Sequence, residues 1–496
     1  MLFNSIHFLI FFPAVVLFYY ILPHKLRWVW LLIVSYFFYM AWNPRYALLL
    51  AASTIITYLS GLLIGRSNKL EDDKKRGFRR KLWVAMSFIL NLAIVVFFKY
   101  FDFAVENMNR VLSFAGIRAL SPAFDVMLPV GISFYTFQAL TYTMDVYRGE
   151  CAVEKNPAKY ALFVSFFPLL ISGPIERSKN LLAQVREKHS FNYGNAKNGL
   201  IRMAWGYFQK AVIADRIAVL VNQVFDNYQQ YAGFYIVVAA VLFAVQLYCD
   251  FSAYSDIAIG AAQVTGFRVT ENFRQPYFAK SVQEFWRRWH ISLSTWFRDY
   301  LYIPLGGSRC SRLKKYRNVM ITFLVSGLWH GASWSFMIWG GLHGVFQVAG
   351  DLIKDLKSRI YAKLKIKAEP FSFRLGGAVI TFIFVDFAWI FFRATGITAA
   401  LGTVKNMFSE FNPWIFFDGS LYTLGLDSGE CIIAGASVIL LFAVDCIRRK
   451  RDILDSLSAQ NAVFRWVLYF ALVVSILIFG VYGGDYVQTQ FIYFQF

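Results

Sequence analysis

The sequence predicts an all-α polytopic membrane protein, with about 11 transmembrane helices plus re-entrant and interfacial helices. Of its 496 residues, 58% are hydrophobic and only 16% are charged. The apolar residues gather in blocks that approach the roughly 17–25 residues of a bilayer-spanning helix. The blocks on which this prediction rests are 6–22, 28–42, 46–65, 82–98, 233–249, 376–392, 431–446 and 465–481.

The basic residues predict how the chain is oriented in the membrane. The net charge of +20 falls in patches, and the bias of basic loops toward the cytoplasm explains these better than nucleic-acid binding does. If the basic stretches 65–81 and 448–451 lie in the cytoplasm, the N-terminus lies on the outer side and the last span runs outward. The tail 482–496 is therefore expected on the extracytoplasmic side. The first residues lack a basic n-region and a cleavage site, so we expect the first block to be retained as a span.

The apolar block 319–350 is too short for two crossings of about 20 residues each. The basic stretches 308–317 and 354–367 flank it, and both are expected inside. One crossing plus a broken or re-entrant half fits this length. Irregular backbone at membrane depth is tolerated only inside protein or beside water, so His330 is expected to face an internal cavity. The preceding polar stretch, 266–318, mixes aromatic residues with arginines and predicts amphipathic helices at the inner interface.

Two of the six histidines are candidates for chemistry. His330 lies deep in an apolar block, and His290 lies among aromatic residues and two arginines. Ionisable residues inside a membrane are usually functional, and a neutral imidazole is a natural general base near pH 7. A buried histidine that only completes the packing is the alternative for each. Ser326, one helical turn before His330, is expected to be a packing residue because no GxSxG motif surrounds it.

The sequence predicts no metal site. Its five cysteines show no CxxC or metal spacing, and neither an HExxH motif nor a carboxylate at helical spacing accompanies His330. Four aspartates lie in apolar blocks. We expect them to pair with buried arginines or hydroxyl groups, and a proton path is the alternative. These aspartates are Asp145, Asp250, Asp256 and Asp386.

Five motifs, in their order and spacing, resemble those of the membrane-bound O-acyltransferase (MBOAT) family. They are LPVGISFYTFQALTYTMDVYRGE, QLYCDFSAYSDIAIG, ENFRQPY, EFWRRWHISLSTWFRDYLYIPLGG and YRNVMITFLVSGLWHG. The resemblance covers nearly the whole chain and is strongest to the bacterial AlgI/PatA-type polysaccharide O-acetyltransferases. It implies a single transmembrane domain over 1–496, with its core motifs in 125–350, arranged around a central tunnel.

The resemblance also implies an enzyme whose two family histidines are His290, in WRRWHIS, and His330, in LWHG. His330 would be the general base that activates an acceptor hydroxyl, and His290 would line the route from the cytoplasm. A third catalytic candidate is Tyr493. The residues expected to bind substrate are Trp329, Trp286, Arg287, Arg288, Asn272 and Asp250.

The implied acyl donor is a cytoplasmic thioester, either acetyl-CoA or an acyl carrier, which is a substrate and not a bound cofactor. The basic residues at 287–288 and 308–317 would attract its phosphate groups, although the positive-inside bias explains them equally well. Water would hydrolyse such a donor. We expect Trp329, Trp334 and Trp339 to exclude water from the site.

The C-terminal FIYFQF motif leads to a second hypothesis, which also follows from the resemblance. Tyr493 would accept the acyl group and pass it to an extracytoplasmic SGNH/AlgJ-like acetyltransferase partner that modifies an exported polysaccharide. A tyrosyl ester has a leaving-group pKa of about 10, so it stays activated for a second transfer. The alternative is that these residues are interfacial aromatics that anchor a helix end.

Two other functions stay open. D-alanyl transfer to teichoic acid would use the same mechanism, although the length and motifs favour acetyl transfer. A proton-coupled transporter would use the same His and Asp residues as a relay, but such proteins tend to contain internal repeats, which this sequence does not show. We therefore expect a multi-pass enzyme of the bacterial cytoplasmic (inner) membrane, in contact with lipid and without a nucleic-acid partner.

Overall fold

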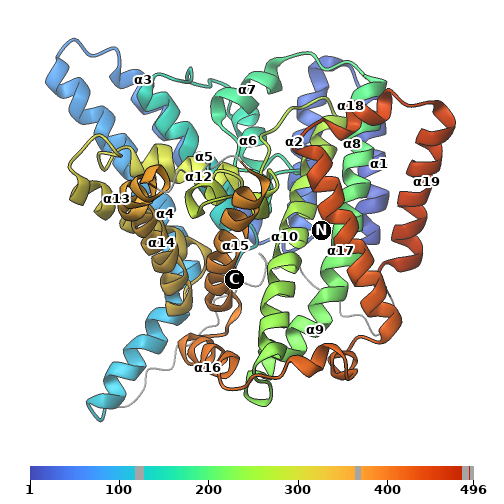
Figure 1. Ribbon diagram of the computed structural model, residues 1–496. Coiled ribbons are helices and arrows are strands. Elements are labelled where there is room, and N and C mark those ends of the chain that lie inside the picture. The colour runs from blue at the N-terminus through green and yellow to red at the C-terminus, as the bar shows by residue number, and fades with distance from the viewer. Residues whose placement is uncertain (118–127, 364–369, 483–490, 492–496) are drawn as a thin grey trace. The chain divides into compact units, whose positions relative to one another are not determined.

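The computed structural model describes residues 1–117, 128–363, 370–482 and 491, and it confirms an all-α protein. Every regular element in this part of the chain is a helix (Figure 1). Seven of the described helices are long and apolar enough to cross a membrane, and α1 (Ile6–Ile21) is a shorter apolar helix. The predicted number of about 11 spans stays a prediction.

The chain divides into two compact units. The first contains 1–203 and 255–270, and the second contains 204–254 and the described residues from 271 onward. Two helices, α8 and α10, contribute to both. That the chain forms a single domain stays a prediction.

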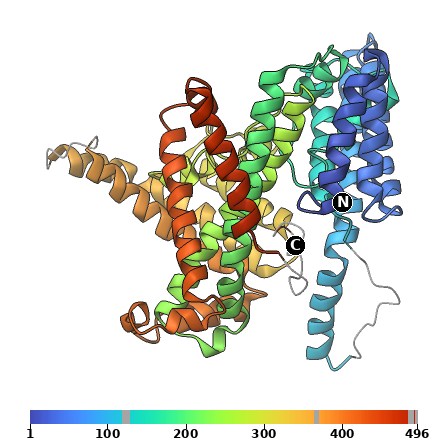
Figure 2. The same ribbon diagram turned by 90° about the vertical axis from the view of Figure 1, so that its right-hand side faces the viewer.

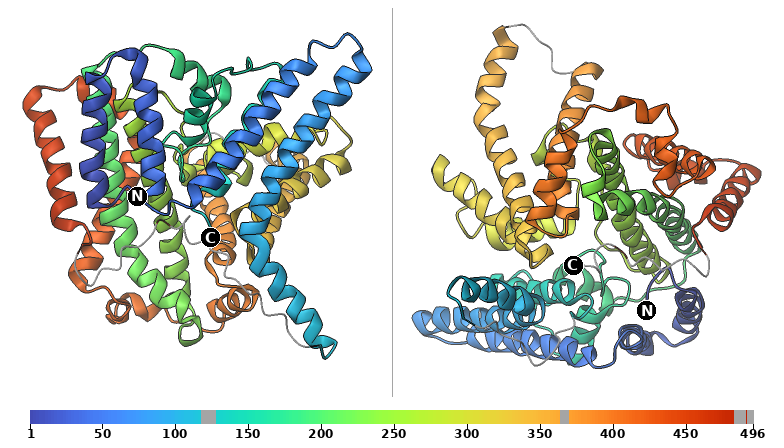
Figure 3. Two further views of the ribbon diagram at one scale, coloured as in Figure 1. Left: turned by 180° about the vertical axis from the view of Figure 1, so that it is seen from behind. Right: turned by 90° about the horizontal axis from the view of Figure 1, so that it is seen from below.

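Helical hairpins make up much of the first unit. Its helices are α1, α2 (His24–Met40), α3 (Tyr46–Ser67), α4 (Asp73–Phe114), α5 (Ile132–Arg148), α6 (Pro157–Ser165), α7 (Ser178–Arg186), most of α8 (Tyr193–Tyr207) and the end of α10 (Phe234–Val264). Helix α3 packs against both α4 and α5, and Figure 3 shows the α3–α4 hairpin from behind.

Helix α4 is much longer than the predicted span 82–98. Its 42 residues measure about 60 Å at 1.5 Å per residue, whereas the hydrocarbon core of a bilayer is about 30 Å thick. The helix begins within the basic stretch because the Asp72 carboxylate accepts hydrogen bonds from the backbone N–H groups of Lys74 and Lys75. Hydropathy therefore identified the apolar middle of this helix and not its ends.

The second unit holds both candidate histidines. Its elements are η1 (Phe208–Ala214), α9 (Asp215–Asp226), η2 (Tyr228–Gln230), most of α10, η3 (Pro276–Phe278), α11 (Val282–Trp286), α12 (Ile291–Phe297), η4 (Arg298–Tyr302), α13 (Arg312–His330), α14 (Trp334–Lys363), α15 (Phe371–Arg393), α16 (Ile397–Met407), η5 (Pro413–Phe416), η6 (Ser420–Thr423), α17 (Ser428–Arg448), α18 (Ile453–Ser458) and α19 (Ala462–Phe479). Elements η1 and η4 are π-helices. Helices α17 and α19 both pack against η1 (Figure 2).

The block 319–350 forms a helical hairpin that is broken directly after His330. Helix α13 ends at His330 and α14 begins at Trp334, so the non-helical connection is short. Of these two helices, only α14 is apolar enough to count among the described candidate spans. This agrees with the prediction of one crossing and a broken half. The short helices α11 and α12 lie in the stretch where amphipathic helices were expected.

Two glycines allow the helices of this hairpin to approach each other. A Cβ atom on Gly340 would lie 2.3 Å from the carbonyl oxygen of Phe323, and a Cβ atom on Gly327 would lie 2.3 Å from that of Phe336. Both contacts are with backbone atoms, which can move only if a helix moves. The glycines therefore fix the spacing of α13 and α14, and with it the position of His330.

We expect Gly340→Ala to destabilise the protein by about 1–3 kcal/mol, the range typical of overpacking. Gly341→Ala is the matched control on the same helix, because its Cβ would meet only the Leu324 side chain at 3.6 Å. Thermal unfolding of both variants in detergent checks this. Equal unfolding temperatures would show that the close approach does not limit the packing.

Candidate active site

His330 is the last residue of α13 and is only 5% exposed. Three rings surround its imidazole, with centroid distances of 4.9 Å to Trp329, 4.9 Å to Trp339 and 5.5 Å to Phe392. Trp334, expected to belong to this enclosure, is 45% exposed. Phe392 of α15 belongs to the enclosure as well, and a part for Trp334 in it stays a prediction. Apolar walls of this kind keep bulk water from a reacting group.

His330 lies in the last turn of α13, next to the carbonyl end of the helix. Carbonyl groups at the C-terminus of a helix carry partial negative charge, which stabilises a cation in the last turn. A histidine that acts as a general base becomes such a cation during the reaction. The end of α13 thus stabilises the charged form that catalysis would create.

His290 precedes α12 in a left-handed backbone conformation, with φ 43° and ψ 54°. This conformation is uncommon for residues other than glycine, and it persists where the surroundings fix it, often at functional sites. The imidazole is fully buried. Phe251 of α10 packs edge-on against it at 4.6 Å, and the Trp329 ring lies 6.1 Å away. Because Trp329 also contacts His330, one indole borders both histidines.

Asn272 determines which nitrogen of His290 carries the proton. The backbone N–H and the hydroxyl group of Ser292 lie 3.3 and 3.0 Å from Asn272 Oδ1. A backbone N–H can only donate, so this atom is an acceptor. His290 Nδ1, 3.1 Å from the same oxygen, must therefore donate, which leaves the lone pair on Nε2. Burial lowers the pKa of His290 to about 3, so the ring is neutral at pH 7.

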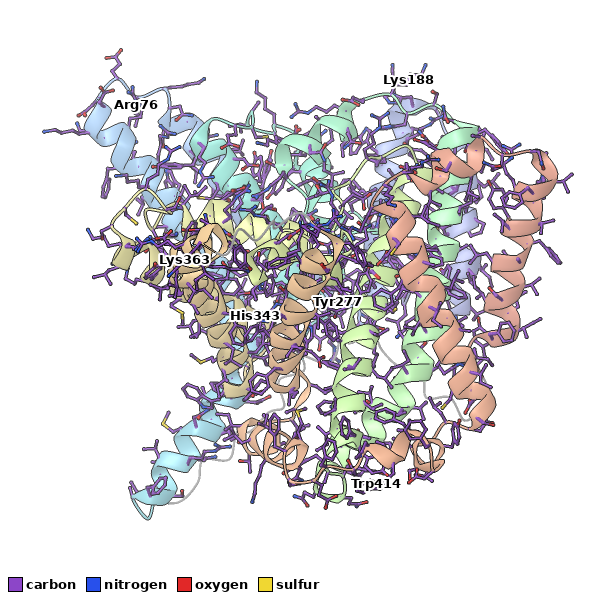
Figure 4. The ribbon with its side chains drawn as sticks, viewed as in Figure 1. Arg76, Lys188, Tyr277, His343, Lys363 and Trp414 are labelled. Carbon is purple, nitrogen blue, oxygen red and sulfur yellow. The ribbon has the colours of Figure 1, made fainter. Side chains whose placement is uncertain are left out.

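Trp286 lies in an aromatic cluster next to the His330 enclosure. Its indole N–H donates to His343 Nδ1 at 3.2 Å, and its ring centroid is 5.8 Å from that of Trp339. Figure 4 labels His343 and Tyr277, whose rings both contact Phe285, at 6.4 and 6.1 Å. Trp339 thus connects this cluster to His330.

The remaining predicted substrate-binding residues are two arginines and one aspartate. Arg287 is exposed, and Arg288 forms an ion pair with Glu284 at 2.6 Å. Asp250 is buried and accepts a hydrogen bond from Lys210 Nζ at 2.6 Å. Substrate binding by these residues stays a prediction. Tyr493 lies outside the described residues.

Two of the other three aspartates have the kind of partner that the sequence predicted, whereas Oδ1 of Asp386 is buried without a hydrogen-bond partner in the described part of the chain. Asp145 accepts a hydrogen bond from the Ser178 hydroxyl at 2.6 Å, and Asp256 pairs with Arg202 at 2.8 Å. Among the residues that the structure describes, no cluster of three or more His, Cys, Asp or Glu side chains could hold a metal ion.

Sequence reasoning missed Phe392 and Lys210. Phe392 reaches His330 from a distant helix, so no local pattern could reveal it. Lys210 did leave a signal, because it is a lone cation within the apolar run WGYFQKAVIAD, five residues before Asp215. An isolated cation in such a run needs a buried carboxylate partner.

These features define a polytopic membrane enzyme with two buried histidines beside one tryptophan. The chain belongs to the membrane-bound O-acyltransferase family, whose profile matches residues 152–392. It is 38% identical over 419 residues to the "Probable alginate O-acetylase AlgI" of Azotobacter vinelandii, with 84% of this chain and 80% of the relative covered. Both histidines lie inside the matched region. The chain is therefore a multi-pass membrane acyltransferase.

Two further relatives differ from each other in identity and in the share of this chain that they cover. The peptidoglycan O-acetyltransferase of Helicobacter pylori is 35% identical over 405 residues, covering 76% of this chain and 73% of the relative. The teichoic acid D-alanyltransferase of Bacillus subtilis is 26% identical over 293 residues, covering 55% of this chain and 70% of the relative. The resemblance to O-acetyltransferases is thus both higher in identity and longer.

Proposed function

We propose that this protein moves an acetyl group from a cytoplasmic thioester across the bacterial cytoplasmic membrane, for O-acetylation of an exported polysaccharide or peptidoglycan. The observation that carries the proposal is the enclosure of His330 at the end of α13, beside a second buried histidine. The named activities of the relatives with high coverage support acetyl as the transferred group. D-alanyl transfer is the second candidate, because a D-alanyltransferase is also related to this chain.

In the proposed reaction His330 takes the proton of an acceptor hydroxyl. The hydroxyl oxygen forms a bond to the thioester carbonyl carbon, and the bond from that carbon to sulfur breaks. The leaving thiolate then takes the proton from the imidazolium, so His330 returns to its neutral form. The rings of Trp329, Trp339 and Phe392 limit competition by water.

His290 serves in this proposal as a positioning residue on the donor route. Its neutral ring can accept a hydrogen bond at Nε2, because Asn272 holds the proton at Nδ1. Neutrality also suits an enclosed aromatic setting, where an isolated cation would be costly. The donor would enter from the cytoplasmic side, where the basic residues were placed by the positive-inside bias.

The acceptor in the first transfer is proposed to be the phenol of Tyr493. The acetyl ester formed there would pass to an extracytoplasmic SGNH-type partner, which would move it to the polymer. The activated character of a tyrosyl ester supports this order of steps. Such a carrier would account for a donor and a final acceptor on opposite sides of a membrane.

The test of the proposed function is mass spectrometry of surface glycans from cells that produce either the native protein or His330→Ala. This measurement reports the acyl group and the acceptor together. Acetyl esters that depend on His330 would support the proposal. D-alanyl esters that depend on His330 would favour the second candidate, and no change in any ester would reject both.

We expect Asn272→Asp to make transfer sensitive to acid near neutral pH. The native pKa of about 3 keeps His290 neutral from pH 5 to 8, whereas a carboxylate beside Nδ1 stabilises the imidazolium and raises that pKa. If the pKa of His290 rises to about 7 in this variant, the fraction of neutral imidazole falls roughly tenfold between pH 8 and pH 6. A pH–rate profile in proteoliposomes checks this, with Ser292→Ala as control. Superimposable profiles for the Asp variant and the native protein would contradict it.

A further inference from the structure

A buried ionic cluster in the second unit includes Asp250, and the steps of the proposed transfer do not involve its lysine. The Lys210 ammonium lies 2.9 Å from an oxygen of Asp215 and 2.6 Å from an oxygen of Asp250, and all three side chains are at most 5% exposed. A buried cation requires such partners because an unpaired charge in the interior is strongly destabilising. The two carboxylates therefore fix the ammonium in place.

A π-helix brings Lys210 and Asp215 together. In η1 the N–H of Asp215 donates to the carbonyl oxygen of Lys210, five residues earlier. This spacing places residues five apart on one face, as residues four apart are in an α-helix. Single π-turns are rare and frequently occur at functional sites. All residues of η1 are buried, so this turn is an interior feature.

The ring of Phe491 covers the ammonium. Lys210 Nζ lies 4.6 Å from the ring centroid, and the Phe491 side chain is 1% exposed. Tyr254, one turn after Asp250 on α10, packs edge-on against the same ring at 4.9 Å. A cation within about 6 Å of a ring centroid is attracted to the π face, most strongly where water is excluded. Phe491 is thus held by a charge as well as by packing.

The end of α19 and the residue Val481 contact the same region. The N–H of Val481 donates to the carbonyl oxygen of Ala211, in η1, at 3.0 Å. The Arg216 guanidinium, at the start of α9, donates to the carbonyl oxygen of Phe479 at 2.7 Å. The exit of α19 and the later Phe491 therefore contact one continuous stretch of helix.

We propose that Lys210, Asp215, Asp250 and Tyr254 form a positioning site for the C-terminal end of the chain, with Phe491 as the bound residue. Lys210 acts in it as a positioning residue and takes no part in the chemistry. The link to transfer rests on the proposed function, because Tyr493 follows Phe491 by two residues in the sequence. A fixed Phe491 limits how far the carrier phenol can range.

The test compares Phe491→Leu with Phe491→Tyr in the full-length protein. Leucine keeps an apolar side chain but has no π face, whereas tyrosine keeps the ring. Carboxypeptidase digestion of the native protein in detergent, followed by mass spectrometry of the C-terminal peptide, reports how often residue 491 leaves its site. Each rate is divided by that of a synthetic peptide with the same C-terminal sequence. Lys210 itself is left unchanged, because its removal would leave two buried carboxylates unpaired.

We expect digestion past residue 491 to be about tenfold faster in Phe491→Leu than in the native protein, and unchanged in Phe491→Tyr. Polymer acetylation should fall only in the leucine variant. Native digestion rates in Phe491→Leu would overturn the proposed site. Faster digestion with full acetylation would overturn its positioning role.

Tyr493→Phe separates this inference from the proposed function. It should lose acetylation and keep the native digestion rate, because it retains Phe491. Retained acetylation in Tyr493→Phe would reject the carrier role of Tyr493. The digestion rates of the Phe491 variants would then decide by themselves whether the site holds the C-terminal end.

Discussion

Replacing His330 with alanine is expected to lower acetyl transfer at least about 100-fold, the lower end of what a general base contributes. The acceptor hydroxyl would keep its proton, and a neutral alcohol is a poor nucleophile. Ester content of surface glycans, normalised to the amount of protein in the membrane, measures the effect. His7→Ala is the control, because His7 is an exposed histidine. Full activity in His330→Ala would exclude the imidazole from the chemistry.

The structure explains why few other groups could replace this imidazole. The walls around His330 come from Trp329, Trp339 and Phe392, with ring centroids within 5.5 Å of it. Aromatic rings exclude water well but cannot remove a proton from an alcohol. The loss in His330→Ala should therefore appear in the rate of transfer per folded protein, while the cavity left by the imidazole also lowers the stability of the fold.

The second large effect is expected from Tyr493→Phe, which removes a single oxygen atom. Without the phenol there is no acceptor for the first transfer, so polymer acetylation should fall at least about 100-fold while the amount of protein stays constant. Tyr482→Phe is the matched control, because Tyr482 is an exposed tyrosine after α19 whose hydroxyl donates to the Ile476 carbonyl oxygen.

Mass spectrometry of the C-terminal peptide provides a direct readout for the same variant. The native protein, given acetyl donor but no polymer partner, should carry one added acetyl group on Tyr493, and Tyr493→Phe should carry none. Unchanged polymer acetylation in Tyr493→Phe would eliminate the carrier and leave the terminal aromatics as interfacial anchors.

Much of the fold could be predicted because membrane-spanning segments are local features. The apolar block 233–249 corresponds to the first part of α10 (Phe234–Val264), and 376–392 lies inside α15. The ends of the helices were less predictable. Charged and polar residues also form helix, so α4 extends on both sides of its apolar middle, and its start depends on the Asp72 cap.

The candidate site could be predicted only in part. His330 and His290 drew attention because an ionisable group in an apolar setting is costly and therefore informative. Phe251 and Phe392 could not be recognised, since phenylalanine is common in such segments and contacts between distant helices leave no periodic signal.

The π-turn in η1 also sets the register of everything that follows it. One residue more or less in a helix rotates all later side chains by about 100° around its axis. Deleting a residue from η1 would give a more regular helix, yet it would turn Arg216 away from the Phe479 carbonyl and separate Asp215 from Lys210. The π-turn therefore rotates the residues that follow it so that Asp215 faces Lys210 while Arg216 faces the Phe479 carbonyl oxygen.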